Sequence, residues 1–157
     1  MRSSSPTPQK RLKPVVISQD IKEASNDKLV AMLSHKSYEF CVMQDMGSDT
    51  LQVATDKLEQ LLLESLSRVF AFNGIEDVSQ FKIYETIELL FADQAIYDCN
   101  KSISLLKRIK YWEGIDVEDE KYIRWMKNRI KGCSRVLCNK LDFITQQERL
   151  SESQKSF

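Results

Sequence analysis

The stretch YIRWMKNRIKGCSRVLCNKLDFI, residues 122–144, is the part of the chain that most directly indicates its fold. Apolar residues recur in it at steps of three and four, which places them along one face of an α-helix. This spacing is close to that of a coiled-coil seam, although Lys140 interrupts the strict seven-residue register. We predict that this seam pairs with a helix of a partner protein through Ile123, Met126, Ile130, Leu137, Leu141 and Ile144.

Helical periodicity continues through the rest of the chain. The three prolines all lie in residues 1–14 and the four glycines are scattered, so long helices are permitted from residue 15 onward. Ser25 is the expected N-cap of one helix. A second helix is expected to end at Asn73-Gly74, because glycine tolerates the positive φ found at helix C-termini.

A third helix is expected to begin at Asp77 and to continue toward Trp112, either unbroken or interrupted at residues 100–102. The last helix is expected to start near Asp116. Gly132 lies inside it, where glycine costs about 1 kcal/mol relative to alanine and permits close packing or a bend.

These segments predict an all-α fold of four to five amphipathic helices. Short connections favour a mostly antiparallel bundle, with a coiled-coil-like C-terminal helix. A chain of 157 residues has the size of one domain. We expect a disordered basic Ser/Pro arm over residues 1–17, a helical bundle over 18–150 and a frayed polar tail over 151–157.

Charge is segregated along the chain although its sum is zero, with 23 basic and 23 acidic residues. Residues 15–100 are acidic overall, whereas residues 121–140 carry seven basic side chains and no acidic one. A hairpin around Gly114 would join this run to the basic segment 101–112 in one surface. The predicted members of this basic patch are Lys107, Arg108, Arg124, Lys127, Lys131 and Arg135.

Two interpretations of the basic patch remain open. It is either a structural face, which is simply solvated or paired with the acidic front half of the bundle, or a binding surface for phosphate groups or for an acidic protein. Tyr122 and Trp125 lie among the charges and fit either packing or stacking on a base. The acidic run 113–120 is better explained by the positive end of a helix dipole than by a metal site.

The N-terminal arm, MRSSSPTPQKRLKP, carries short regulatory motifs. The run TPQK, residues 7–10, resembles the substrate pattern of cyclin-dependent kinases, and Ser5 precedes a proline in a minimal form of the same pattern. Residues 10–13 resemble a nuclear-import cluster. Phosphorylation of Ser5 or Thr7 would add about −1.5 to −2 charges to this basic arm. These motifs predict a nuclear, cell-cycle-linked phosphoprotein, with the cytoplasm as the alternative location.

Motifs for catalysis are absent from the sequence. Four scattered glycines exclude a phosphate-binding loop, and no serine lies in a Gly-x-Ser-x-Gly turn. The single histidine, His35, has no glutamate three residues before it, as di-iron bundles require. We therefore predict that the chain is not an enzyme and has no cofactor. No run of 18 apolar residues is present, so neither a membrane span nor a membrane partner is expected.

The four cysteines, Cys41, Cys99, Cys133 and Cys138, lack the paired spacing of zinc modules. We expect reduced side chains that serve as small apolar residues, with a disulfide or a zinc site as less favoured alternatives. Cys133 and Cys138 are five residues apart, so they should point to different sides of their helix.

Taken together, these features predict a non-enzymatic helical interaction subunit of a larger, nuclear assembly, with other protein subunits as its partners. The alternative is a nucleic-acid-binding protein that uses residues 121–140 and the basic arm.

Overall fold

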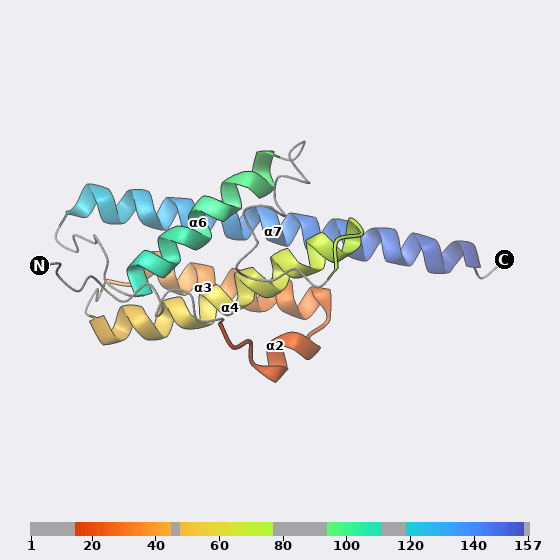
Figure 1. Ribbon diagram of the computed structural model, residues 1–157, viewed down its shortest axis with the longest axis horizontal. Helices are drawn as coiled ribbons and strands as arrows, with labels where there is room; N and C mark the ends of the chain where they lie inside the picture. Colours follow the sequence, from red (N-terminus) through yellow and green to blue (C-terminus); the bar gives the residue numbers. More distant parts are fainter. Residues whose placement is uncertain (1–14, 45–47, 77–93, 111–118, 156–157) are drawn as a thin grey trace, which may run out of the picture.

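In a computed structural model of the chain, residues 15–44, 48–76, 94–110 and 119–155 are described, and every element among them is a helix (Figure 1). The predicted all-α fold is confirmed. The helices are α2 (Gln19–Glu23), α3 (Asn26–Val42), α4 (Ser48–Phe72), α6 (Gln94–Lys110) and α7 (Glu120–Lys155). The helix predicted to begin at Asp77 and the arm residues 1–14 lie outside the described residues.

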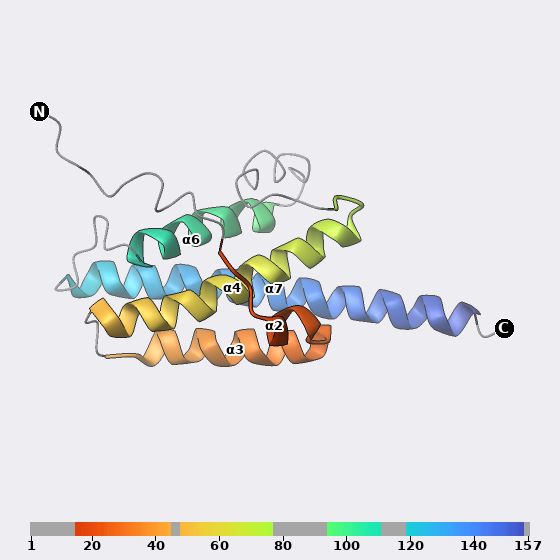
Figure 2. The same ribbon diagram turned by 60° about the horizontal axis from the view of Figure 1, so that its bottom comes forward.

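Helix α7 is the long axis of the molecule, and α3, α4 and α6 all contact it (Figures 1 and 2). It has 36 residues and is therefore about 54 Å long. Helix α3 runs opposite to α4, and α6 runs opposite to α7 (Figures 1 and 2), as expected for helices joined by short connections. Hydrogen bonds join residues 99 and 102 of α6 to 133 and 129 of α7, in an order that fits antiparallel packing.

The predicted helix ends at Ser25 and Gly74 are confirmed in detail. The Ser25 hydroxyl accepts a hydrogen bond from the Lys28 amide at 3.1 Å, as an N-cap does. Gly74 has φ +82°, and its amide donates to the Ala71 carbonyl while the Ile75 amide donates to the Phe70 carbonyl. These two bonds form a Schellman motif, which ends α4 and turns Ile75 back against the core.

The seam of α7 faces the interior of its own bundle. Its apolar side chains meet those of α3, α4 and α6, and they belong to one continuous core. Met126, Ile130, Leu137 and Leu141 have no exposed surface, Ile144 is 6% exposed and Ile123 is half-buried. The interpretation of the whole seam as a partner-binding surface is therefore corrected: neighbouring helices of the same chain already cover it, except for the half-buried Ile123 at its start.

Helix α6 is continuous through residues 100–102, which agrees with the unbroken alternative at this point, and the Ser102 hydroxyl donates to the Arg129 carbonyl at 3.3 Å. Other predicted boundaries differ from those observed. Val15 and Ile17 pack against the core, so the bundle begins before residue 18. Asp119 accepts from the amides of residues 121 and 122 and thereby caps α7, which starts three to four residues later than predicted.

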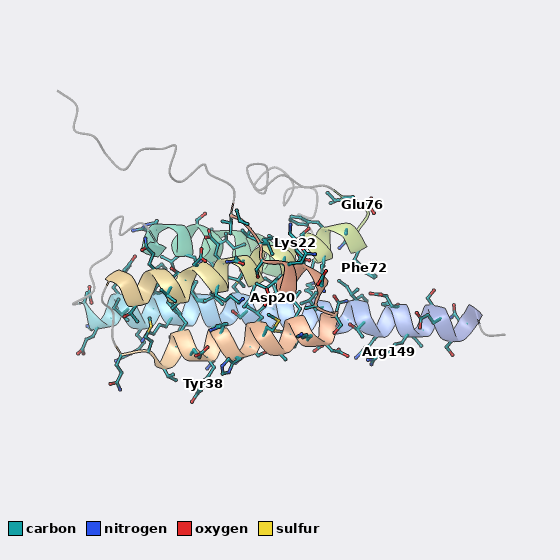
Figure 3. All side chains as sticks on the ribbon, turned by 90° about the horizontal axis from the view of Figure 1, so that it is seen from below. Asp20, Lys22, Tyr38, Phe72, Glu76 and Arg149 are labelled. Atoms are coloured by element: carbon teal, nitrogen blue, oxygen red, sulfur yellow. The ribbon has the colours of Figure 1, made fainter. Side chains whose placement is uncertain are left out.

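The C-terminal part of α7 is helical to Lys155, so the tail is not frayed from residue 151. Two contacts tie this part to the bundle. Phe143 meets Phe72 of α4 edge to face at 6.1 Å, and Arg149 pairs with Asp27 of α3 at 3.1 Å; Figure 3 labels Phe72 and Arg149. Once a helix is nucleated, each further residue adds a backbone hydrogen bond at little cost, which explains why polar residues 151–155 remain helical.

No helix in the described part of the chain is long and apolar enough to cross a membrane.

Candidate partner-binding groove

The start of α7 projects beyond the end of α3. The two helices pack side by side from Cys138, whose sulfur lies 3.5 Å from the Ser34 hydroxyl, to Cys41, whose thiol donates to the Lys127 carbonyl at 3.7 Å. Helix α3 ends at Val42, one residue beyond this last contact. Helix α7 begins about two turns before Lys127, so α3 leaves one side of these turns uncovered (Figures 1 and 2).

A groove with a volume of about 560 Å³ occupies this place. Its floor is apolar and half-buried, and its rim is cationic. The floor contains Cys41, Met43 and Ile123; the rim contains Arg124, Lys127 and Lys131; Gln44, Glu120 and Asn128 complete the lining. We call this site the α3–α7 groove.

The three rim cations differ in what they contact. The Lys127 ammonium donates to the Met43 carbonyl at 2.5 Å, so it holds the chain that leaves α3 against α7. Arg124 and Lys131 are exposed, and neither forms an ion pair with any residue that the structure describes. Arg135, one turn further along α7, is also exposed and continues the same row. The acidic front half of the described bundle therefore does not neutralise this row by direct contact.

Cys41 contributes a neutral group to the floor. Burial raises the pKa of its thiol, and the nearby positive charges of Lys131 and Lys127 oppose this rise without cancelling it. At neutral pH the side chain is therefore a protonated thiol, which behaves as a small apolar surface.

The aromatic residues of this region lie next to the groove but do not line it. Tyr122 stacks on Trp125 at 5.7 Å between ring centroids, and the Arg129 guanidinium lies 5.7 Å from the centre of the Trp125 ring. Trp125 is 48% exposed. Tyr122 lies about one turn before Trp125 and Arg129 about one turn after it, so a nucleic-acid base that stacked on this ring would have to share it with these two side chains.

The predicted basic patch is brought together only in part. Arg124, Lys127 and Lys131 share the groove. Helix α6 packs antiparallel to α7, as a hairpin requires, although Gly114 lies outside the described residues. Arg108 is exposed on α6 and does not line the α3–α7 groove, and the side chain of Lys107 lies outside the described part of the structure.

The other candidate residues form no reactive site among the described side chains. His35 is exposed and lies 3.3 Å from Glu39 on the same helix. The four cysteines are free, and Cys133 and Cys138 point to different neighbours as predicted, Cys99 of α6 and Ser34 of α3. No group of three or more metal-ligating side chains occurs in the described residues. Ser5 and Thr7 lie outside them.

The apolar floor of the groove was not predicted from the sequence. Met43 and Cys41 are more than 80 positions from Lys127 and lie at the end of a different helix. The only sequence signal was the helical spacing of Met43 with Phe40, which indicates an apolar face but not its neighbour.

No protein-family model, curated protein or solved structure matches this chain.

Proposed function

We propose that this chain is a non-enzymatic helical interaction subunit that binds a partner protein at the α3–α7 groove. The observation that carries the proposal is the combination of an apolar floor with exposed Arg124 and Lys131, neither of which has a described ionic partner. Exposed cations next to a recessed apolar surface are typical of interfaces in which an apolar anchor is ringed by charges.

The proposed setting is a larger, nuclear assembly. It is supported by the nuclear-import-like cluster at residues 10–13 and by Ser5 and Thr7, which resemble sites of proline-directed kinases. Phosphorylation there would cancel much of the positive charge of the arm and so weaken any contact that depends on it.

Nucleic-acid binding is the second candidate function. It is supported by the seven basic and no acidic side chains of residues 121–140, which would attract a phosphate backbone. The two candidates differ in what they require, because phosphate contacts need no apolar floor.

Affinity purification from the native cell tests the proposed function. The bait is compared with the double variant Arg124→Glu, Lys131→Glu and with a control, Lys22→Glu, Lys28→Glu, which changes the net charge by the same amount. Lys22 is on α2 and Lys28 at the start of α3, both exposed and away from the start of α7; Figure 3 labels Lys22.

The expected result is a defined set of proteins that co-purify with the wild type and the control but not with the groove variant, and that survive nuclease treatment. The same proteins on all three baits would contradict the proposed function. Proteins lost after nuclease treatment would favour the nucleic-acid alternative.

A further inference from the structure

We infer that the occupant of the α3–α7 groove is an acidic amphipathic helix of a partner protein, with carboxylates facing Arg124 and Lys131 and an apolar side chain seated between Met43 and Ile123. This inference rests on the proposed function and specifies the partner's chemistry.

The shape of the groove fits a helix. From Glu120 to Lys131 the lining of α7 extends for about 16 Å, or three helical turns. Over the adjoining turns, the same side of α7 is covered by α3. A partner helix in the groove would therefore lie on the same side of α7 as α3, against Met43 and Gln44, which follow the end of α3.

The charges fit carboxylates at helical spacing. Arg124, Lys127 and Lys131 are separated by three and four positions, which is the spacing of side chains along one face of a facing helix. Lys127 is partly committed to the Met43 carbonyl, so Arg124 and Lys131 are the groove cations that have no ionic partner among the described residues. Their exposed pairs would contribute little affinity alone, which is why the partner also needs an apolar anchor.

The floor favours protein over nucleic acid. Met43 and Ile123 present apolar surface that a phosphodiester backbone cannot use, whereas a leucine or isoleucine of a helix can bury it. Methionine adapts its shape to different apolar partners. Tyr122 and Trp125, the aromatic residues on which a base could stack, do not line the groove, and Trp125 already contacts Tyr122 and Arg129.

Glu120 determines where along the groove the acidic residues of the partner helix can lie. It lines the groove at the start of α7, while the cations lie further along the helix. A carboxylate of the partner beside Glu120 would be repelled, so the acidic residues of the partner belong over Arg124 and Lys131 and a neutral or basic residue belongs beside Glu120.

The test uses synthetic peptides with the full-length chain. The main probe is a fluorescent helical peptide of about 18 residues, or five turns, with glutamates four residues apart on one side and two leucines beside them. One control peptide replaces the leucines with serine, and a second probe is single-stranded or duplex DNA. Binding is measured by fluorescence anisotropy at low and high salt, and circular dichroism confirms that each protein variant is folded.

The acidic leucine peptide is expected to bind the wild type and the Lys22→Glu, Lys28→Glu control equally. The Arg124→Glu, Lys131→Glu variant is expected to bind it about tenfold more weakly or worse, with reduced dependence on salt. Met43→Gln, which removes apolar floor without changing charge, is expected to weaken binding several-fold, as is the loss of leucine from the peptide.

Equal binding of the serine and leucine peptides, no binding of either, or tighter binding of DNA than of the leucine peptide would overturn the inference. The proposed function would survive these results if cellular proteins still depended on Arg124 and Lys131 in the affinity purification. If neither the peptide nor the cellular proteins depended on these residues, both would be wrong.

Discussion

At the scale of single residues, Arg68 does most to join separate elements. Its guanidinium donates to Glu64 at 2.8 Å on its own helix, to the Asn26 side chain at 2.8 Å and to the carbonyls of Ile21 and Lys22 at 3.2 Å each. The side chain is 19% exposed. It thereby donates to two carbonyls near the end of α2 and holds in place a helix of only five residues that could not persist alone.

Arg68→Lys is expected to lower the free energy of unfolding by about 2 kcal/mol, because a single ammonium group cannot reproduce the several directed donors of a guanidinium. Urea unfolding followed by circular dichroism measures this change. Arg149→Ala is the control. Its pair with Asp27 is mostly exposed, so its loss should cost no more than about 1 kcal/mol. Equal losses in the two variants would contradict the assigned role of Arg68.

At the scale of elements, α7 combines a buried seam with an exposed basic row. The sequence periodicity predicted both faces, because a repeat of three and four positions defines a side of a helix. It did not predict what covers the seam. Gly132 is exposed and lines an open cavity between α6 and α7, together with Cys99 and Ser102. An added Cβ would meet no atom within 4 Å, so the glycine is not required for close packing within the described bundle.

Gly132→Ala is therefore expected to raise the free energy of unfolding by about 1 kcal/mol, the difference in helix propensity between the two residues. The contrasting variant is Gly74→Ala. Its space is also open, but φ +82° strains an L-residue, so a loss of about 1 kcal/mol is expected. Thermal and urea unfolding measure whether each substitution raises or lowers the free energy of unfolding. A destabilising Gly132→Ala would show that this position is crowded in the folded chain.

At the scale of the whole molecule, cysteine thiols lie at the contacts of α7 with two of the three helices that pack against it, α6 and α3. The Cys99 and Cys133 thiols each donate to the other residue's carbonyl at 3.9 Å across α6 and α7. The bond with Cys99, together with burial, raises the pKa of Cys133 well above its ordinary value. On the α3 side, burial raises the pKa of Cys138.

These raised pKa values predict that the fold loses stability at alkaline pH. Above the ordinary thiol pKa, at roughly pH 8 to 10, the unfolded chain releases thiol protons that the folded chain retains, so unfolding is favoured as pH rises. Urea unfolding across this range should show the fall. Cys133→Ala should show a smaller fall, even though its stability at pH 7 is lower because of the cavity. If the free energy of unfolding fell equally with pH in the wild type and in Cys133→Ala, the Cys133 thiol would not be a source of the fall.

Local chemistry accounts for much of the observed fold. The absence of proline after residue 14, the hydroxyl of Ser25 and the turn at Gly74 are properties of short stretches of chain, and each could be interpreted without knowing its neighbours. The periodicity of residues 122–144 likewise distinguishes an apolar side from a cationic side wherever the helix lies.

Which side chains are buried, and which lie next to one another, cannot be predicted from short stretches of sequence, because both depend on residues far apart in the chain. The seam of α7 is equally compatible with a foreign helix and with α3, α4 and α6, and the free energy of burying apolar surface is the same in either case. Only the packed structure shows that the chain covers its own seam, and that the end of α3 places Met43 beside Arg124 and Lys131. The candidate interface is therefore the α3–α7 groove, with its cationic rim, instead of the apolar seam of α7 that the sequence suggested.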